Sequence, residues 1–184
     1  PEGARAAAFA GARLTAADLH DAGITVNCTP VLDVPEAGSH DIIGDRAFSF
    51  DPDVVGDLGR AVVEGTLAGG VLPVIKHVPG HGRARADSHL ALPRIDASAE
   101  ELIEVDFRPF MALCHAPLAM TAHVLLPAFD EKRPASVSPV IMGEVIRELI
   151  GLTGLVMSDD IGMKALGGSM GERAGAVIDA GCDV

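Results

Sequence analysis

The sequence contains no tryptophan and no tyrosine, and only six phenylalanines among its 184 residues. The two aromatic side chains that combine an apolar face with a polar handle are therefore missing. Any recognition of a carbohydrate has to come from polar groups instead. The chain also lacks a run of 18 apolar residues, which argues against a membrane-spanning helix.

Basic residues are scarce: 14 Lys and Arg stand against 26 Asp and Glu, giving a formal net charge of −12. This balance argues against a nucleic-acid backbone or an anionic membrane surface as a partner, because both attract basic patches. The three cysteines, Cys28, Cys114 and Cys182, are odd in number, far apart and without metal-site spacing. They are typical of thiols in a reducing compartment, which predicts a cytoplasmic protein.

Short apolar runs alternate along the chain with longer segments of helical period, which is the pattern of βα units around a parallel sheet. The first strand lacks the Gly-x-Gly-x-x-Gly turn of dinucleotide-binding sheets, and this favours a (β/α)8 TIM barrel over an open doubly wound sheet. The predicted strands are 24–34, 71–78, 117–124 and 154–158, with a fifth starting at Cys182, and the predicted helices are 52–67, 97–113, 139–149 and 163–180.

A complete TIM barrel has eight strands and about 250 residues. This chain supplies four complete strands and the start of a fifth, and it opens in a helix-like stretch, Ala4 to Ala22. We therefore expect residues 1–184 to be a partial TIM-barrel catalytic domain of about four and a half βα units. Barrel units are expected to be missing at both ends.

The most informative segment follows the predicted strand 71–78. It begins Lys76-His77-Val78-Pro79-Gly80-His81-Gly82 and continues to Asp87-Ser88-His89. Glycines permit backbone geometries that are closed to other residues, and histidines exchange protons near neutral pH. The segment therefore predicts a loop that holds a polar ligand.

Other polar residues follow the remaining strands at the same end of the predicted sheet. Asp33 follows the first strand, Arg46 lies in the next loop, His123 ends the third strand, and Asp159 and Asp160 end the fourth. In barrel enzymes the active site lies at the carboxyl ends of the strands. These residues are therefore expected to converge on one face.

Five segments together resemble a known family in order and spacing. They are Gly44-Asp45-Arg46-Ala47-Phe48, the loop 76–82, Asp87-Ser88-His89, Met120-Thr121-Ala122-His123 and Ser158-Asp159-Asp160-Ile161-Gly162-Met163. The family is that of the bacterial β-N-acetylglucosaminidases of glycoside hydrolase family 3. The resemblance covers nearly the whole chain, and the loop after the second strand is its most specific part.

The resemblance implies a retaining glycosidase, which needs a carboxylate nucleophile and a group that donates and later accepts a proton. Side chains alternate along a strand, so Asp159 and Asp160 cannot face the same way. The sequence alone leaves that choice open, whereas the resemblance makes Asp159 the nucleophile. It also makes His89 the acid/base group, paired with Asp87. A neighbouring carboxylate orients a histidine and favours its protonated form.

The resemblance further implies that Arg46, Lys76 and His77 bind the sugar. His81 is expected to shape the loop, and Asp33 and His123 are at most supporting residues. The expected substrate is a saccharide ending in β-linked N-acetylglucosamine, processed during cytoplasmic turnover of peptidoglycan fragments. No metal or organic cofactor is expected.

Three alternatives stay open from the sequence. The enzyme could use phosphate in place of water, because a histidine repels that anion less than a carboxylate does. The chain could bind cell-wall fragments without catalysis, although a binder has no need of Asp159. It could also be a metal-binding module built from His77, His81, His89 and His123. Pro79 and Gly80 argue against a helical His-x-x-x-His metal site between the first two.

Overall fold

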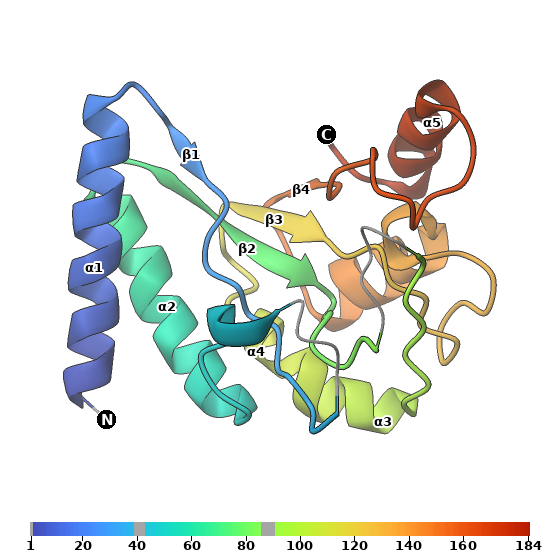
Figure 1. The fold of residues 1–184 in the computed structure, drawn as a ribbon, viewed down its shortest axis with the longest axis horizontal. Coiled ribbons are helices and arrows are strands. Elements are labelled where there is room, and N and C mark those ends of the chain that lie inside the picture. The colour runs from blue at the N-terminus through green and yellow to red at the C-terminus, as the bar shows by residue number, and fades with distance from the viewer. Residues whose placement is uncertain (1, 39–42, 86–90) are drawn as a thin grey trace.

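The computed structural model describes residues 2–38, 43–85 and 91–184. Four parallel strands form a sheet in the order β1-β2-β3-β4, so each strand lies beside the next one in the sequence (Figure 1). A doubly wound sheet reverses its strand order, whereas a barrel adds each strand on the same side. The strands are β1 (Val26–Asn27), β2 (Leu72–Val78), β3 (Leu118–Thr121) and β4 (Leu155–Met157).

Helices connect the strands and cover the sheet (Figure 1). Two segments, η2 and η4, are π-helical. The helical segments are α1 (Glu2–Asp21), η1 (Gly44–Arg46), α2 (Pro52–Ala68), α3 (Ala99–Glu101), η2 (Leu102–Asp106), α4 (Arg108–Ala112), η3 (Ala135–Val137), η4 (Ile141–Leu149) and α5 (Met170–Ala180). The predicted parallel α/β class is confirmed. Among the described residues, no helix has both the length and the apolar character needed to cross a bilayer.

Side-chain caps determine where several helices begin. The Asp51 carboxylate accepts hydrogen bonds from the backbone N–H groups of Asp53 and Val54, and Pro52 takes the first helical position of α2. The Ser138 hydroxyl likewise accepts from the N–H of Ile141, just before η4. Such caps satisfy N–H groups that have no partner inside the helix. Both helix starts agree with the sequence prediction.

The prediction for the last helix was wrong at its start, since α5 begins at Met170 and not at residue 163. Gly168, with φ of +89°, precedes a capping box in which the Glu172 carboxylate accepts from the Ser169 N–H. The box satisfies the first N–H groups of the helix and so fixes its origin. Residues 163–169 consequently form a loop between β4 and the helix.

The first strand is also shorter than the predicted 24–34. Of residues 24–34, only the two residues of β1 pair regularly with β2. Pro30 interrupts the ladder because it has no N–H to donate. The chain nevertheless continues along β2: Lys76 N–H donates to the Pro30 carbonyl, and Leu32 N–H donates to the Lys76 carbonyl at 2.6 Å. This irregular pairing carries Asp33 to the carboxyl end of β2.

The fifth strand expected at Cys182 is not formed within the described residues. Residues 182–184 do lie alongside β4, because Asp183 N–H donates to the Val156 carbonyl at 2.7 Å. Ser158 N–H donates in turn to the Val184 carbonyl at 2.9 Å. The hydrogen bonds are those of a chain running beside β4, without a regular ladder.

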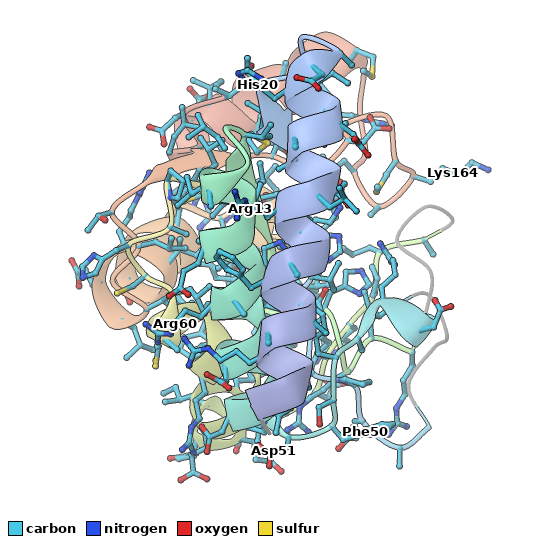
Figure 2. All side chains as sticks on the ribbon, turned by 90° about the vertical axis from the view of Figure 1, so that its left-hand side faces the viewer. Arg13, His20, Phe50, Asp51, Arg60 and Lys164 are labelled. Atoms are coloured by element: carbon cyan, nitrogen blue, oxygen red, sulfur yellow. The ribbon has the colours of Figure 1, made fainter. Side chains whose placement is uncertain are left out.

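Helix α1 packs along α2, and Figure 2 shows the two helices side by side. Gly65 of α2 and Gly69, the residue that caps its carboxyl end, make the close approach possible. A Cβ atom at Gly65 would overlap the Phe9 carbonyl oxygen, and one at Gly69 would lie 2.5 Å from the Cβ of Ala16. Larger residues at these positions would push the helices apart.

The core lies between the sheet and the helices that follow β2 and β3. Ile75 of β2, Phe107 between η2 and α4, and Phe110 of α4 are fully buried. In β2 every residue from Pro73 to Val78 except Lys76 is buried, which is typical of a parallel strand covered on both faces.

Replacing Phe110 by alanine is expected to lower the free energy of unfolding by about 3–5 kcal/mol, through lost burial and the cavity left behind. Phe50, labelled in Figure 2, is 73% exposed and provides the matched control. Phe50→Ala should change the stability by less than about 0.5 kcal/mol. Denaturant unfolding of the complete protein measures both, and equal losses would contradict the assigned core.

Candidate active site

Asp33 is a fully buried carboxylate at the carboxyl ends of β1 and β2. Its Oδ2 lies 2.6 Å from Nδ1 of His77, and its Oδ1 accepts the backbone N–H of His81 at 2.7 Å. The backbone N–H of His77 lies 3.4 Å from the same Oδ1. Because a carboxylate only accepts, Nδ1 of His77 carries a proton and Nε2 is the nitrogen left for a ligand. Asp33 thus orients His77 and fixes the start of the loop.

The charges of this cluster follow from its burial. Burial opposes the ionisation of Asp33, but His77 and His81 outweigh that cost and hold the pKa of Asp33 below its usual value. Burial lowers the pKa of His81, and the nearby Asp33 only partly opposes this. His81 is therefore neutral at pH 7. Its Nδ1 is buried and has no hydrogen-bond partner among the described residues.

His123 ties the end of β3 to the end of β4. Its Nδ1 lies 2.6 Å from the Ser136 hydroxyl, and its Nε2 lies 3.1 Å from the Asp160 carbonyl oxygen. A carbonyl only accepts, so Nε2 carries the proton and Nδ1 accepts from Ser136. Burial lowers the pKa of His123, which keeps it neutral. A neutral histidine thereby holds the backbone of the turn that follows β4.

The two aspartates of that turn have different environments. Asp160 is exposed, and its Oδ1 accepts the Gly162 N–H at 2.7 Å, so its carboxylate caps the turn. Asp159 is half-buried, and its charge acts on both His81 and His123. The charge of Asp160 also acts on His123, and Oδ1 of Asp159 accepts the backbone N–H of Asp160 at 2.8 Å. The choice of Asp159 over Asp160 as the nucleophile stays a prediction.

Lys76 and Arg46 occupy different surroundings. Lys76 is a half-buried residue of β2, next to His77. Arg46 lies on the exposed turn η1, where its Nε donates to the Ile43 carbonyl at 3.3 Å. Lys76 therefore lies within β2, near its carboxyl end, and Arg46 lies between β1 and α2. Their roles as sugar-binding residues stay predictions.

Asp87 and His89 lie outside the described residues, so their pairing and the acid/base role of His89 also stay predictions. The structure does describe the base of their loop. Gly80 has φ of +145°, and a Cβ atom at Gly82 would overlap the Val34 carbonyl oxygen. Both positions require glycine. Close contact with Val34 keeps the start of the loop against the end of β1.

A buried ion pair also supports this loop. Nε of Arg83 donates to Oδ2 of Asp106 at 2.7 Å, and Nη1 of Arg83 donates to Oε1 of Glu36 at 2.9 Å. Asp106 is 1% exposed, and its Oδ1 has no partner among the described residues. Burial therefore raises the pKa of Asp106 to about 6, although Arg83 opposes the shift.

The metal-site alternative gains no support from the described part of the chain. Residues 2–38, 43–85 and 91–184 contain no group of three or more histidine, cysteine, aspartate or glutamate side chains that could hold a metal ion. The rings of His77 and His123 are already engaged by Asp33, by Ser136 and by a backbone carbonyl.

Two residues connect the strand ends of the site through contacts that the sequence did not predict. Asp33 and His123 were expected to be supporting residues at most, and each links two strand ends of the site. Their only sequence signal was their position, directly after predicted strands. A single polar residue at a strand end has no sequence pattern around it. Nothing in the sequence therefore distinguishes a buried, hydrogen-bonded side chain from a solvated one.

The fold and the site define a parallel α/β protein with histidines and carboxylates gathered at the carboxyl ends of its strands. Residues 4–184 match the N-terminal domain of glycosyl hydrolase family 3, and the chain belongs to this family. The membership assigns the sheet to the (β/α) barrel of the family, as predicted.

Individual relatives agree with this assignment. A beta-hexosaminidase of Methylococcus capsulatus is 40% identical over 187 residues, which cover 100% of this chain and 55% of the relative. The crystal structure of NagZ from Neisseria gonorrhoeae in complex with N-trifluoroacetyl-D-glucosamine superposes with a TM-score of 0.91 at 35% identity, covering 100% of this chain and 53% of that one. The structure of a glycoside hydrolase family 3 beta-N-acetylglucosaminidase from Paenibacillus superposes with a TM-score of 0.93 at 33% identity. The match covers 98% of this chain and 35% of that one. The chain thus spans about half the length of the curated relatives it matches.

The raised pKa of Asp106 predicts a pH-dependent stability. Because the folded state holds this proton up to about pH 6 and an unfolded aspartate only to 3.8, stability should fall as the pH rises between these values. The loss amounts to about 3 kcal/mol. In Asp106→Asn this part of the pH dependence should be absent. Unfolding of both proteins at pH 4, 5, 6 and 7 measures it, and parallel curves would contradict the assignment.

Proposed function

We propose that the complete protein carrying this chain is a retaining β-N-acetylhexosaminidase that removes terminal β-linked N-acetylglucosamine. The observation that supports this most is the half-buried Asp159, on a turn held by His123 and electrostatically coupled to His81. The names of the relatives, a beta-hexosaminidase and a beta-N-acetylglucosaminidase, agree with it.

In the proposed first step, a carboxylate oxygen of Asp159 attacks the anomeric carbon while the bond to the leaving oxygen breaks. Protonated His89, oriented by Asp87, gives its proton to that oxygen. In the second step neutral His89 takes a proton from water, and the water oxygen displaces Asp159. Two displacements return the β configuration.

The sugar itself is proposed to contact Arg46, Lys76 and His77. Because Nδ1 of His77 donates to Asp33, Nε2 of the neutral ring can accept a hydrogen bond from a sugar hydroxyl. Lys76 adds a cationic donor from the adjoining position. Such polar contacts replace the aromatic stacking that a chain without tryptophan and tyrosine cannot provide.

The biological setting is proposed to be the cytoplasmic turnover of peptidoglycan fragments, without a metal or organic cofactor. Turnover by the complete protein should accordingly survive treatment with a chelator. If the chelator abolished activity and a divalent metal restored it, the result would instead favour a metal-dependent protein.

Turnover of an aryl β-N-acetylglucosaminide tests the catalytic assignment. Asp159→Ala in the complete protein should lower kcat by roughly a thousandfold or more, because no nucleophile remains. The matched control is Asp160→Ala, which removes a turn cap and should cost less than about tenfold. His89→Ala should lose about 10²–10⁴-fold through the missing proton transfer. An active Asp159→Ala enzyme would refute the mechanism.

The same assay separates hydrolysis from phosphorolysis. Hydrolysis predicts free N-acetylglucosamine at an unchanged rate when phosphate is added. Faster turnover with release of the sugar 1-phosphate would identify a phosphorylase of the same family. Binding of the sugar without turnover by either route would favour the non-catalytic alternative.

A further inference from the structure

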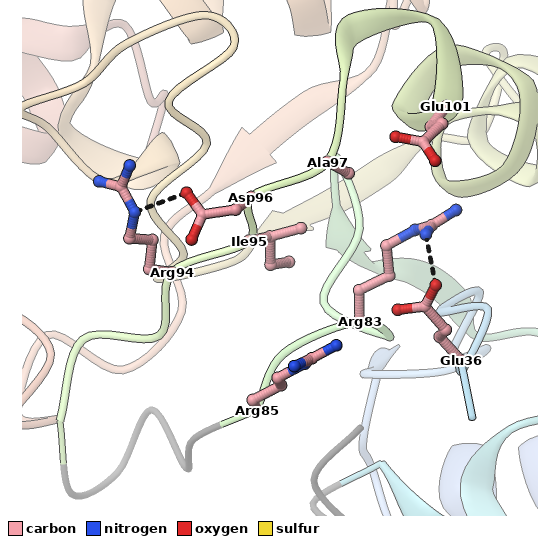
Figure 3. A pocket seen from close by; sticks show the side chains of 8 residues that line it. All are labelled: Glu36, Arg83, Arg85, Arg94, Ile95, Asp96, Ala97 and Glu101. Atoms are coloured by element: carbon pink, nitrogen blue, oxygen red, sulfur yellow. Dashed lines mark hydrogen bonds and ion pairs between the residues drawn. The ribbon is translucent and has the colours of Figure 1, made fainter. Parts of the chain in front are cut away.

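The cavity of about 280 Å³ beside the loop that follows β2 has a wall of balanced charge (Figure 3). Its described lining contains three guanidiniums and three carboxylates, those of Arg83, Arg85, Arg94, Glu36, Asp96 and Glu101. The wall therefore favours neither an anion nor a cation. A different polar pair, formed by Ser136 and His123, leads to the turn that carries Asp159.

Ser136 of η3 and His123, just after β3, are in direct contact. Both side chains are fully buried, and the Ser136 hydroxyl lies 2.6 Å from Nδ1 of His123. A buried ring nitrogen without a hydrogen-bond partner is costly, so this hydroxyl stabilises the tautomer in which Nδ1 accepts and Nε2 donates. Ser136 thus determines which nitrogen of His123 can donate.

The Nε2 donor of His123 contacts the backbone of Asp160. Nε2 lies 3.1 Å from the Asp160 carbonyl oxygen, and the N–H of the same residue donates to Oδ1 of Asp159 at 2.8 Å. The Ser158 hydroxyl also donates to the Asp159 carbonyl at 2.8 Å. A series of contacts therefore connects Ser136, through His123 and the Asp160 backbone, with the carboxylate of Asp159.

The far half of the turn is held from a different element. Nη1 of Arg173, in α5, donates to the carbonyl oxygen of Ile161 at 2.8 Å and to that of Met163 at 3.1 Å. His123, in contrast, holds the residue next to Asp159. Losing the Ser136 hydroxyl should therefore disturb the Asp159 end of the turn without releasing the turn as a whole.

The contact with Asp160 also distinguishes the two carboxylate oxygens of Asp159. Oδ1 accepts the Asp160 N–H, whereas no described residue donates to Oδ2. A carboxylate held through one oxygen by a charge-assisted hydrogen bond presents the other oxygen in a defined direction. Oδ2 is consequently the oxygen available to attack.

We propose that Ser136 is a positioning residue for Asp159. By fixing the tautomer of His123 it holds the Asp160 backbone, and this orients Oδ2 toward the anomeric carbon. The inference rests on the proposed function, in which Asp159 is the nucleophile. A displaced reacting atom lowers the rate even where the substrate still binds. Because the sugar contacts are assigned to residues on other segments, the loss of Ser136 should lower kcat and leave KM nearly unchanged.

Turnover of an aryl β-N-acetylglucosaminide by the complete protein tests this role. Ser136→Ala should lower kcat about tenfold, the factor that corresponds to one lost hydrogen bond, with KM changed by less than about twofold. Ser136→Thr keeps the hydroxyl and should restore most of the loss.

Ser138→Ala is the matched control. Ser138 is as buried as Ser136, but its hydroxyl contacts the carboxylate of Asp130 and the backbone N–H of Ile141. The control variant should be less stable and should keep its kcat. An unchanged kcat in Ser136→Ala would overturn the inference, and so would equal losses of kcat in the two alanine variants.

NMR separates this inference from the proposed function, because it needs no turnover. Proton–nitrogen correlation spectra of the histidine rings in the unchanged complete protein should show the proton of His123 on Nε2. A proton on Nδ1 overturns the inference whether or not any variant folds. In Ser136→Ala the amide resonance of Asp160 should move, and in Ser138→Ala it should not.

The same resonance decides the case in which no substrate is cleaved. A moved Asp160 amide in Ser136→Ala then supports positioning by Ser136, and the missing turnover contradicts the proposed function alone. An unmoved Asp160 amide overturns the inference.

Discussion

The arrangement of the site depends on the buried carboxylate of Asp33. It lies where the irregular end of the first strand meets the end of β2, and it accepts hydrogen bonds from the ring of His77 and from the backbone of His81. An ionised carboxylate in the protein interior needs such partners, since without them it costs several kcal/mol. The same contacts therefore stabilise the charge and fix the geometry of the loop.

His123 likewise links the ends of β3 and β4, although its ring is neutral. Its two ring nitrogens contact Ser136 and the Asp160 backbone, which requires a neutral ring with one defined tautomer. Together Asp33 and His123 connect the polar ends of β1 with β2 and of β3 with β4. The charge of Asp159 acts on His81, which follows β2, and on His123, which follows β3.

Much of this arrangement follows from the sequence, because it depends on local rules. The apolar runs predicted the strands, and Asp51 and Ser138 predicted two helix starts. What the sequence does not reveal depends on contacts between distant positions. Arg83 and Asp106 are 23 residues apart, and Asp33 and His77 are 44 apart, so no spacing marks either pair. The late start of α5 was missed for a local reason, the capping box at Ser169.

Trapping the glycosyl-enzyme is the most direct test of the central claim, that Asp159 is the nucleophile of a double displacement. The complete protein would be incubated with a 5-fluoro-N-acetylglucosaminyl fluoride, which slows hydrolysis of the covalent intermediate, and its peptides would be analysed by mass spectrometry. The account predicts one added sugar, located on Asp159. A sugar on Asp160, or turnover without any covalent intermediate and with inversion of the product, would contradict it.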